Sequence, residues 1–341
     1  MKLITFTVPC YNSAEYMHHC IDTLLTAGDE AEILIIDDGS TKDNTAEIAD
    51  EYAAKYPNIV RVIHQENGGH GEGVNQGIRN AAGLYFKVVD SDDWLDTIAL
   101  KRVMDRIRSF VNEGKKIDLF LCNYVYEHPD GPGHVMKYSN VFPKNKICTW
   151  DDIRAFKATQ YLMMHSVIFR TKVVRASGVV LPKHTFYVDN LFMLAPLPLC
   201  RNIYYMDENL YRYFIGRPDQ SVQEASVLKR IDQQYRVTML TADFFDMAAI
   251  TKQSKKLARV IYHHISILIT ITAVFLYMSN TPEKLQMAKT MWEKIKERDP
   301  VLYRHMRYAS LSTLTTLPGK AGRKLTVGTY RVVKKVFRFN D

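Results

Sequence analysis

Two aspartates one residue apart follow an apolar stretch and could bind a divalent cation. The stretch Phe86–Val89 leads directly into Asp90-Ser91-Asp92-Asp93. Carboxylate oxygens are hard ligands that suit Mg²⁺ or Mn²⁺, and a site with only one or two protein carboxylates leaves coordination positions for nucleotide phosphates. An acidic turn ahead of a helix predicted to begin after Asp96 is the alternative, and the aspartates alone do not decide between the two.

The first third of the chain has the pattern of an α/β domain with a largely parallel sheet. Short runs rich in β-branched residues alternate with segments whose apolar residues recur at helical spacing. The predicted strands are Leu3–Val8, Ile33–Ile36, Ile59–Ile63 and Tyr85–Val89, and the predicted helices between them are Ala14–Leu25, Asn44–Lys55 and Gly73–Ala82. In such a sheet, ligands bind beyond the carboxyl ends of the strands.

Polar clusters follow each predicted strand, so one edge of the sheet is the expected binding site. The first three clusters are Pro9-Cys10-Tyr11-Asn12, Asp37-Asp38-Gly39-Ser40 and the glycine loop Asn67–Gly73. The glycine loop opens a helix and therefore directs backbone N–H groups towards this edge. It does not match the dinucleotide fingerprint in register or position, and no G-x-x-x-x-G-K-[ST] motif occurs, so hydride chemistry and a P-loop are not expected.

The predicted secondary structure changes twice in the rest of the chain. From about Asp118 it is strand-rich, with candidate strands Leu119–Tyr126, Met163–Phe169 and Ile203–Met206, and from Gln223 it is nearly all helical. We expect a catalytic domain over residues 1–222, a helical region over 223–318 and a basic tail over 319–341. The apolar run Ile265–Met278 is shorter than the roughly 18 residues of a membrane span, which predicts a buried core helix.

The composition is typical of a globular protein. The chain has 341 residues, of which 47% are hydrophobic and 24% charged, enough for a full core. The apolar stretch at the N-terminus is too short for a signal peptide, so we expect a cytoplasmic protein. The five cysteines are widely spaced without a C-x-x-C pair, which predicts reduced thiols and no zinc site.

The basic tail carries most of the formal net charge of +8. Thr329, Val332, Val333, Val336 and Phe337 fall on one helical face, and the opposite face holds Arg331, Lys334, Lys335 and Arg338. This pattern fits an anionic membrane surface, and equally a charged face that packs on the protein by its apolar side. Because the charge is confined to the tail, nucleic acid is not an expected partner.

Four ordered motifs resemble family 2 glycosyltransferases of the inverting GT-A type. They are TVPCYN (Thr7–Asn12), ILIIDDGSTKDNT (Ile33–Thr45), the long segment Asn67–Asp96 and, more weakly, FYVDNLF (Phe186–Phe192). The resemblance implies a Rossmann-like, mainly parallel sheet flanked by helices, followed here by the helical C-terminal region. It also implies a nucleotide diphosphate-sugar donor, most often a UDP-sugar, and Mn²⁺ or Mg²⁺ as cofactor.

The resemblance also implies roles for individual residues. Binding of the nucleotide falls to Pro9, Tyr11, Asn12, Asp38, Asn67, Gly68, Asn75 and Asp90, and binding of the metal to Asp92. Arg217, in a Gly-Pro segment after the core, resembles a basic residue that reaches the diphosphate, although an ordinary exposed turn would look the same.

Asp189 is the expected catalytic base. Inversion requires a group that removes the proton from the acceptor hydroxyl as it attacks the anomeric carbon. Family members usually have Glu-Asp at this point, whereas this chain has Val188-Asp189, so the base is present and its neighbour is replaced. The alternative for Asp189 is a cap on the helix predicted from Asn190 to Leu197.

The expected reaction is sugar transfer to a cell-surface glycan, a wall polymer or a lipid-linked acceptor, by an enzyme that could lie on the inner face of the plasma membrane. Two rival functions are a non-catalytic nucleotide-binding scaffold and a sugar nucleotidyltransferase. The second should show a glycine-rich, arginine-containing loop after the first strand, where this chain has Pro9–Asn12.

Overall fold

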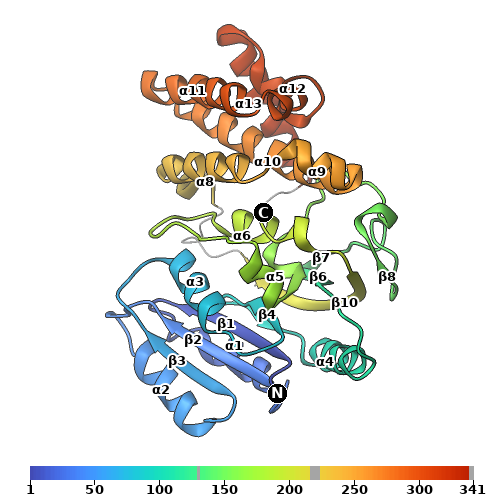
Figure 1. The fold of residues 1–341 in the computed structure, drawn as a ribbon. Coiled ribbons are helices and arrows are strands. Elements are labelled where there is room, and N and C mark those ends of the chain that lie inside the picture. Colours follow the sequence, from blue (N-terminus) through green and yellow to red (C-terminus); the bar gives the residue numbers. More distant parts are fainter. Residues whose placement is uncertain (129–130, 216–222, 338–341) are drawn as a thin grey trace. The chain divides into compact units, whose positions relative to one another are not determined.

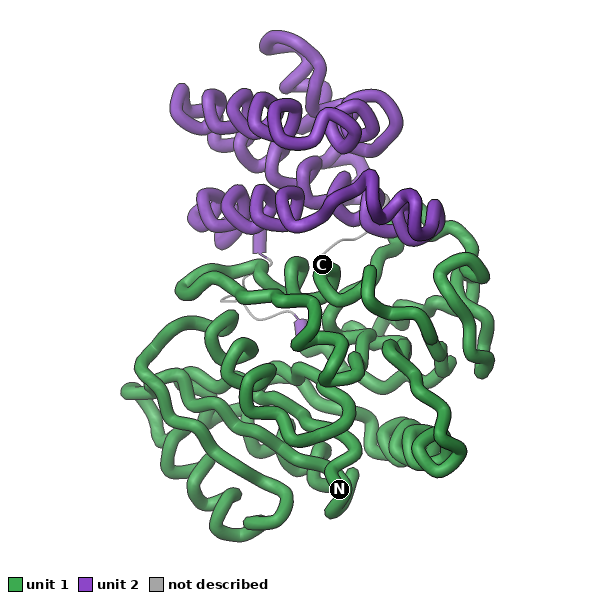
Figure 2. The backbone as a smooth tube through the Cα atoms, viewed as in Figure 1, with its two compact units in different colours: residues 1–214 green, residues 215–341 purple. Residues whose placement is uncertain are grey.

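The computed structural model describes residues 1–128, 131–215 and 223–337. The chain forms two compact units, Met1–Phe214 and Ile215–Asp341 (Figure 2). The first unit contains the sheet and the second is helical. The domain boundaries predicted after residues 222 and 318 stay predictions.

A mixed, mostly parallel sheet organises the first unit (Figure 1). In the described residues it has ten strands, in the order β3-β2-β1-β4-β9-β6-β10-β5, with β7 beside β6 and β8 beside β10. Strands β1 to β4 are mutually parallel, as are β6 and β10, and β9 runs antiparallel between β4 and β6. The strands are β1 Ile4–Cys10, β2 Ala31–Asp37, β3 Val60–His64, β4 Tyr85–Val88, β5 Trp94–Leu95, β6 Leu119–His128, β7 Gly131–Met136, β8 Ile147–Cys148, β9 Val167–Arg170 and β10 Ile203–Phe214.

Helices connect these strands and cover the sheet. They are α1 Met17–Leu25, α2 Thr45–Lys55, α3 His70–Asn80, α4 Thr97–Asn112, α5 Thr171–Ala176 and α6 Asp189–Leu194, with 3₁₀ turns η1 Trp150–Asp152, η2 Met164–Ser166 and η3 Leu197–Leu199. Helix α4 begins after Asp96, as predicted, because the Asp96 carboxylate accepts a hydrogen bond from the Ala99 N–H at 2.9 Å. Helix α3 approaches β1 so closely that a Cβ on Gly77 would overlap the Thr7 side chain.

The α/β pattern predicted for the first third is confirmed, and later elements differ in detail. The segment predicted as a strand from Met163 to Phe169 instead begins with the 3₁₀ turn η2, and β9 starts only at Val167. The strand predicted over Ile203–Met206 continues to Phe214, with irregular register against β6 between Tyr205 and Tyr211. The sequence pattern did not predict this length because Asp207, Glu208 and Asn209 interrupt the apolar residues of the strand.

The second unit is built around helix α10. Its helices are α7 Glu224–Lys229, α8 Ile231–Asp243, α9 Met247–Gln253, α10 Lys255–Ser279, α11 Pro282–Arg298, α12 Pro300–Tyr308 and α13 Gly319–Phe337, with the 3₁₀ turn η4 Leu311–Thr316. Helix α10 packs against all the other helices of the unit and against η4. Thr238 and Thr272 link α8 to α10 through a buried hydrogen bond of 2.8 Å.

The length expected for the apolar helix of this unit is wrong. The run Ile265–Met278 is part of a 25-residue helix, Lys255–Ser279, which by length and composition alone could cross a membrane. The helix is longer than its apolar run because Ser254 caps it upstream, through its hydroxyl and the Leu257 N–H. In its most apolar window 72% of the residues are buried, as the sequence predicts for a core helix.

Candidate active site

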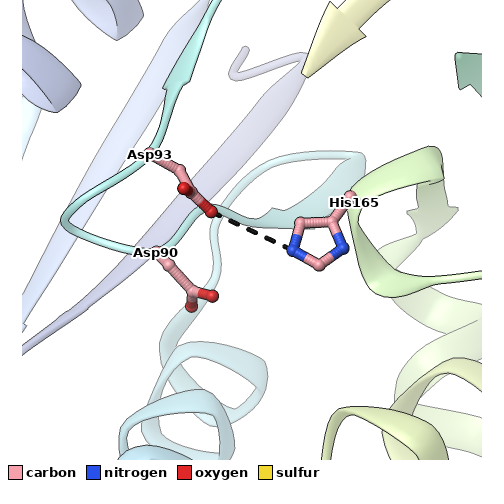
Figure 3. Close-up of side chains that lie close together, drawn as sticks. All are labelled: Asp90, Asp93 and His165. Atoms are coloured by element: carbon pink, nitrogen blue, oxygen red, sulfur yellow. Dashed lines mark ion pairs between the residues drawn. The ribbon is translucent and has the colours of Figure 1, made fainter. Parts of the chain in front are cut away.

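The turn after β4 places three aspartates at the carboxyl edge of the parallel strands, and Figure 3 shows two of them, Asp90 and Asp93. Asp93 is buried, and its carboxylate accepts hydrogen bonds from the Tyr211 hydroxyl at 2.6 Å and the Phe214 N–H at 2.8 Å. Burial and the negative charges of Asp92 and Asp90 raise the pKa of Asp93 well above its usual value. The Asp90 N–H in turn donates to the Tyr211 hydroxyl at 3.1 Å. Asp93 therefore anchors the turn to β10, whereas Asp90 and Asp92 are half-buried.

Asp90, Asp93 and His165 form a cluster that could hold a metal ion. One ligand atom from each lies within 4.8 Å of the others, and the His165 Nε2 is 3.9 Å from Asp93 Oδ2 (Figure 3). Burial lowers the pKa of His165 to about 3, so the ring is neutral, and neither ring nitrogen has a hydrogen-bond partner in the described residues. Two oxygens and one nitrogen fit Mn²⁺ better than Mg²⁺. Asp92 lies on the same turn but is not part of this cluster.

His70, the first residue of α3, connects the glycine loop to this turn. Its Nε2 is 2.8 Å from Asp90 Oδ1. Burial by itself would lower the pKa of His70, but the carboxylates of Asp90, Asp189 and Asp92 raise it. Burial opposes ionisation of Asp90, and the charge and hydrogen bond of His70 nevertheless lower its pKa. The structure thus pairs the His70 ring with the Asp90 carboxylate at the start of α3.

Asp189 lies in the same electrostatic environment. It is the first residue of α6, half-buried, and burial raises its pKa to about 6, with His70 lowering and Asp90 raising that value. The N-cap residue is Val188, which makes no side-chain cap, and the Asp189 carboxylate accepts hydrogen bonds from the backbone N–H groups of Asn190 and of Asp189 itself, so the helix-cap alternative stays open. The residue before α6 is the buried Val188, whose Cγ2 would be 3.3 Å from a Cβ on Gly71. This packing against the glycine loop leaves little room for a glutamate.

A buried lysine underlies the aspartate turn. Lys87 of β4 is 1% exposed, and its ammonium group donates to the backbone carbonyls of His165 at 2.8 Å and Val167 at 3.3 Å. The ammonium also lies 4.9 Å from the centre of the Tyr211 ring. Burial lowers the pKa of Lys87 to about 7, although Asp90 raises it. The lysine links β4 to the segment that carries His165.

The first of the predicted nucleotide-binding motifs lies in the turn after β1. Pro9 is buried at the end of that strand, and Tyr11 is 49% exposed beside it. Asn12 adopts a positive φ of 50°, and its side-chain Oδ1 accepts hydrogen bonds from the backbone N–H groups of Thr41 and Lys42, both at 3.1 Å. Asn12 therefore joins the turn after β1 to the turn after β2.

Asp38 holds the glycine loop in place. Its carboxylate accepts hydrogen bonds from Gln65, from the Asn67 amide at 3.1 Å, and from the N–H groups of Gly68 at 2.7 Å and Gly69 at 2.8 Å. Gly69 has a φ of 81°, and a Cβ there would be 3.1 Å from the His184 backbone, so the position requires glycine. Both oxygens of Asp38 are thus engaged within the protein, and the expected contact with the base or ribose stays a prediction.

We expect Asp38→Ala to weaken both the fold and nucleotide binding. The substitution leaves the N–H groups of Gly68 and Gly69 without their acceptor, which costs about 1–3 kcal/mol for each buried group that stays unpaired. Denaturant unfolding and calorimetric titration with UDP measure the two effects. Asp105→Ala, which removes an exposed carboxylate from α4, is the control. Unfolding and UDP binding that match the wild type would contradict this role of Asp38.

The remaining predicted nucleotide-binding residues of the glycine loop and of α3 differ in their surroundings. Asn67 is exposed, and the backbone carbonyl of Gly68 accepts a 2.7 Å hydrogen bond from the His184 N–H. Asn75 is buried, and its amide donates to Glu72 at 3.0 Å and to the Leu181 carbonyl at 2.9 Å while accepting from the Leu181 N–H at 2.9 Å. Both donor hydrogens of Asn75 are engaged in this link between α3 and the segment before α6, and its expected contact with the nucleotide stays a prediction.

Sequence reasoning left out three residues that the structure brings to this site. His70 lies in the glycine loop within reach of a phosphate or sugar, but both His70 and His165 are of a type that is more often structural, so neither was predicted as a site residue, and Lys87 was not considered. A charged side chain inside the apolar strand Tyr85–Val88 was the available signal for Lys87, because a buried strand position normally excludes it. Arg217, predicted to reach the diphosphate, lies outside the described residues.

Comparisons with known proteins agree with the motifs. The family described as "Glycosyl transferase family 2" matches residues 5–161. The glycosyltransferase EpsJ of Bacillus subtilis is 24% identical over 262 residues, which are 74% of this chain and 73% of EpsJ. The glycosyltransferase MG025 homolog of Mycoplasma pneumoniae is 39% identical over 224 residues, which are 64% of this chain and 70% of that protein.

A solved structure shows the same fold. Residues 1–349 of Staphylococcus aureus TarS in complex with UDP-GlcNAc superpose with a TM-score of 0.66 at 19% identity, covering 99% of this chain and 92% of that one. At this level of identity the likeness concerns the fold alone. Together with the relatives, it confirms the resemblance drawn from the motifs. The chain belongs to glycosyl transferase family 2 and is a glycosyltransferase.

Proposed function

We propose that this enzyme transfers a sugar, with inversion and with the help of a divalent cation, from a UDP-sugar to a hydroxyl of a cell-surface glycan, wall polymer or lipid-linked acceptor. The observation that carries the proposal is the common electrostatic environment of Asp90, His70 and Asp189 at the carboxyl edge of the sheet. Motifs from three turns end at that edge beside them. UDP is favoured as the nucleotide because the solved relative TarS binds UDP-GlcNAc.

In this proposal Asp189 acts as the base. A pKa of about 6 leaves its carboxylate mostly ionised at neutral pH and still basic enough to take a proton. The acceptor oxygen forms its bond to the anomeric carbon while its proton moves to Asp189. The bond from that carbon to the diphosphate oxygen breaks, and the diphosphate leaves with the electron pair.

The negative charge that develops on the diphosphate needs stabilisation. A cation bound at the turn after β4 would supply it as a Lewis acid. We propose Asp92 as a ligand of Mn²⁺ or Mg²⁺, helped by Asp90, and the position of Asp90 in the cluster with Asp93 and His165 supports this placement. His70, held by Asp90, and the N-terminus of α3 add positive potential on the same side.

An assay for release of UDP from a UDP-sugar, in the absence of an acceptor, distinguishes the proposed glycosyltransferase from the two alternative functions. A glycosyltransferase should hydrolyse the donor slowly and only with the cation, whereas a scaffold should bind it without turnover, and a nucleotidyltransferase should instead exchange pyrophosphate. Thermal-shift screening of UDP-, GDP-, CDP- and dTDP-sugars with Mn²⁺ identifies the base first. Preferential stabilisation by a GDP-, CDP- or dTDP-sugar would contradict the proposed donor.

We also propose that the enzyme works in the cytoplasm on an anionic membrane surface, bound through α13. The helix packs on its own unit through Thr326 and Tyr330, with the Tyr330 ring 5.7 Å from that of Phe275. Its exposed face bears Leu325, which is 55% exposed, and Val332, which is 63% exposed. Exposed basic residues lie on this face too, namely Lys320, Lys324, Arg331 and Lys335. The expectation that Val332 and the basic residues Arg331 and Lys335 occupy opposite faces is therefore wrong, because all three side chains are exposed to solvent. Exposed apolar side chains next to lysines fit an interface rich in anionic lipid.

Reversing charge on this face should release the enzyme from anionic vesicles. We expect the double variant Lys324→Glu, Lys335→Glu to bind vesicles of phosphatidylcholine and phosphatidylglycerol at least about tenfold more weakly, since each basic residue near such a surface is worth about 1 kcal/mol. Sedimentation at two salt concentrations measures this. Lys42→Glu, an exposed lysine of the first unit, is the control. Equal sedimentation of the double variant, or equal binding to pure phosphatidylcholine, would contradict an electrostatic surface.

A further inference from the structure

Four tyrosines form a row on neighbouring strands of the first unit. Strands β6 and β10 are parallel, and their register pairs Tyr124 with Tyr211 and Tyr126 with Tyr213. Residues two apart on a strand point to the same face, so each strand contributes two successive rings to one face. The row runs towards the carboxyl ends of the strands, where ligands bind in sheets of this kind.

The inner end of the row is part of the catalytic edge. Tyr124 and Tyr211 are buried, at 1% and 0% exposure, and Tyr211 holds the Asp93 carboxylate. The ring of His165 lies edge-on to Tyr211, with centroids 4.7 Å apart. These contacts fix the depth and orientation of the row relative to the aspartate turn.

The outer pair, Tyr126 and Tyr213, is half-buried, and the Tyr126 ring also stacks against His134 with centroids 6.3 Å apart. Their centroids are 5.6 Å apart with planes tilted by 45°. The His165 ring stacks against Tyr213 at 4.3 Å, and the Tyr126 hydroxyl is 3.2 Å from that of Tyr124. The Tyr213 hydroxyl has no hydrogen-bond partner among residues 1–128, 131–215 and 223–337. The pair is therefore rigid and still offers one polar group.

This pair lies on the opposite side of β9 from the donor motifs. The donor motifs follow β1, β2, β3 and β4, and in the sheet order β9 separates those strands from β6 and β10. Asp189 lies between the two sides, because helix α6, which it begins, packs against η2, whose His165 stacks on Tyr213, and its neighbour Val188 packs against Gly71 of the glycine loop. The proposed base thus has the donor turn on one side and the tyrosine pair on the other.

We propose that Tyr126 and Tyr213 form an acceptor subsite that binds a sugar ring, so that the accepting hydroxyl belongs to a carbohydrate. Pyranose rings present an apolar face of C–H groups and a rim of hydroxyls, which match the aromatic faces and the Tyr213 hydroxyl. A polyol phosphate or a lipid phosphate lacks such a face. The inference rests on the proposed function, since it assigns Asp189 to the acceptor bound there.

Saturation-transfer NMR with simple methyl glycosides tests the subsite. The probes are methyl β-D-glucopyranoside, methyl β-D-galactopyranoside and methyl N-acetyl-β-D-glucosaminide, added to full-length enzyme with UDP and Mn²⁺, with glycerol 3-phosphate as the non-sugar comparison. We expect at least one glycoside to receive saturation on its ring C–H protons. Absence of transfer to all three from an enzyme that binds UDP, or transfer to glycerol 3-phosphate alone, would overturn the proposal.

Variants then separate this subsite from the donor site. We expect Tyr126→Ala and Tyr213→Ala each to reduce glycoside affinity by about tenfold, whereas the control variant Tyr56→Ala keeps both glycoside binding and acceptor-independent release of UDP. Tyr126→Phe should bind nearly as wild type because the ring remains, and it shows whether an alanine variant fails only through misfolding. Tyr56→Ala removes another half-buried, stacked tyrosine and is the control. Glycoside binding that survives both alanine substitutions would overturn the subsite, whereas loss of UDP release in the wild type would instead refute the donor proposal.

Discussion

Asp189→Asn removes sugar transfer and leaves UDP affinity nearly unchanged. The substitution keeps the size and hydrogen-bonding geometry of the side chain but eliminates the group that accepts the proton, which should reduce kcat by roughly 10²–10⁴-fold. Coupled detection of the transferred sugar, alongside calorimetric titration with UDP, measures the two quantities. The same substitution at the exposed Asp105 is the control. Transfer at the wild-type rate would remove Asp189 from the mechanism.

The pH dependence of the wild type should report the same group. The base must be ionised, and burial raises the pKa of Asp189 to about 6. The value of kcat/KM should therefore fall about tenfold for each pH unit below 6 and level off above it. Asp189→Asn should lose that limb of the profile in whatever activity remains.

As the pH rises through about 6, the contribution of Asp189 to the stability of the fold should decrease while the activity increases. A carboxyl whose pKa is raised on folding favours the folded state at low pH, and that contribution is lost as the pH rises through about 6. At pH 7 the ionised, partly desolvated carboxylate is destabilising. We therefore expect Asp189→Asn to unfold at a Tm equal to or above that of the wild type at pH 7, which shows that its inactivity is not caused by unfolding.

Asp92→Ala abolishes the cation-dependent release of UDP from a UDP-sugar. If Asp92 is a ligand of the cation, its loss leaves the charge on the departing diphosphate without stabilisation, and we expect a decrease of roughly 10²–10³-fold. Initial rates over a range of Mn²⁺ concentrations measure both the maximal rate and the apparent metal affinity.

A paired variant distinguishes Asp92 from the ligand cluster that the structure brings together. His165→Phe removes the nitrogen ligand but keeps an aromatic ring against Tyr211 and Tyr213. We expect this variant to retain most of its Mn²⁺ dependence. Normal Mn²⁺ dependence in Asp92→Ala together with its loss in His165→Phe would show that the cation binds to Asp90, Asp93 and His165 and not to Asp92.

The sequence predicted the donor side of the enzyme because that side is made of consecutive local units. Each strand from β1 to β4 is a short apolar run, and each is followed at once by its polar turn. Placing Asp38, Asn67 and Asp90 at one edge requires only that the strands be parallel. The role of Asp38 in holding Gly68 and Gly69 depends on a loop meeting a turn, which periodicity does not express.

The proposed acceptor side could not be predicted from local patterns, because its residues meet through pairings distant in sequence. Tyr126 meets Tyr213 only through the register of β6 with β10, and that register is irregular. His165 was expected on a strand, whereas the 3₁₀ turn η2 directs it towards Asp93. Asp189 was predicted through the family motif and not through its surroundings, and its neighbour Val188 is explained only by packing against Gly71.

A crystal structure with UDP and Mn²⁺ tests the central arrangement most directly. The account predicts an anomalous manganese peak at the turn Asp90–Asp93, in contact with Asp92 and the diphosphate, with the uracil beside Tyr11 and the Asp189 carboxylate facing the position of the transferred sugar. A nucleotide bound away from this turn, or Asp189 directed away from the diphosphate, would contradict it.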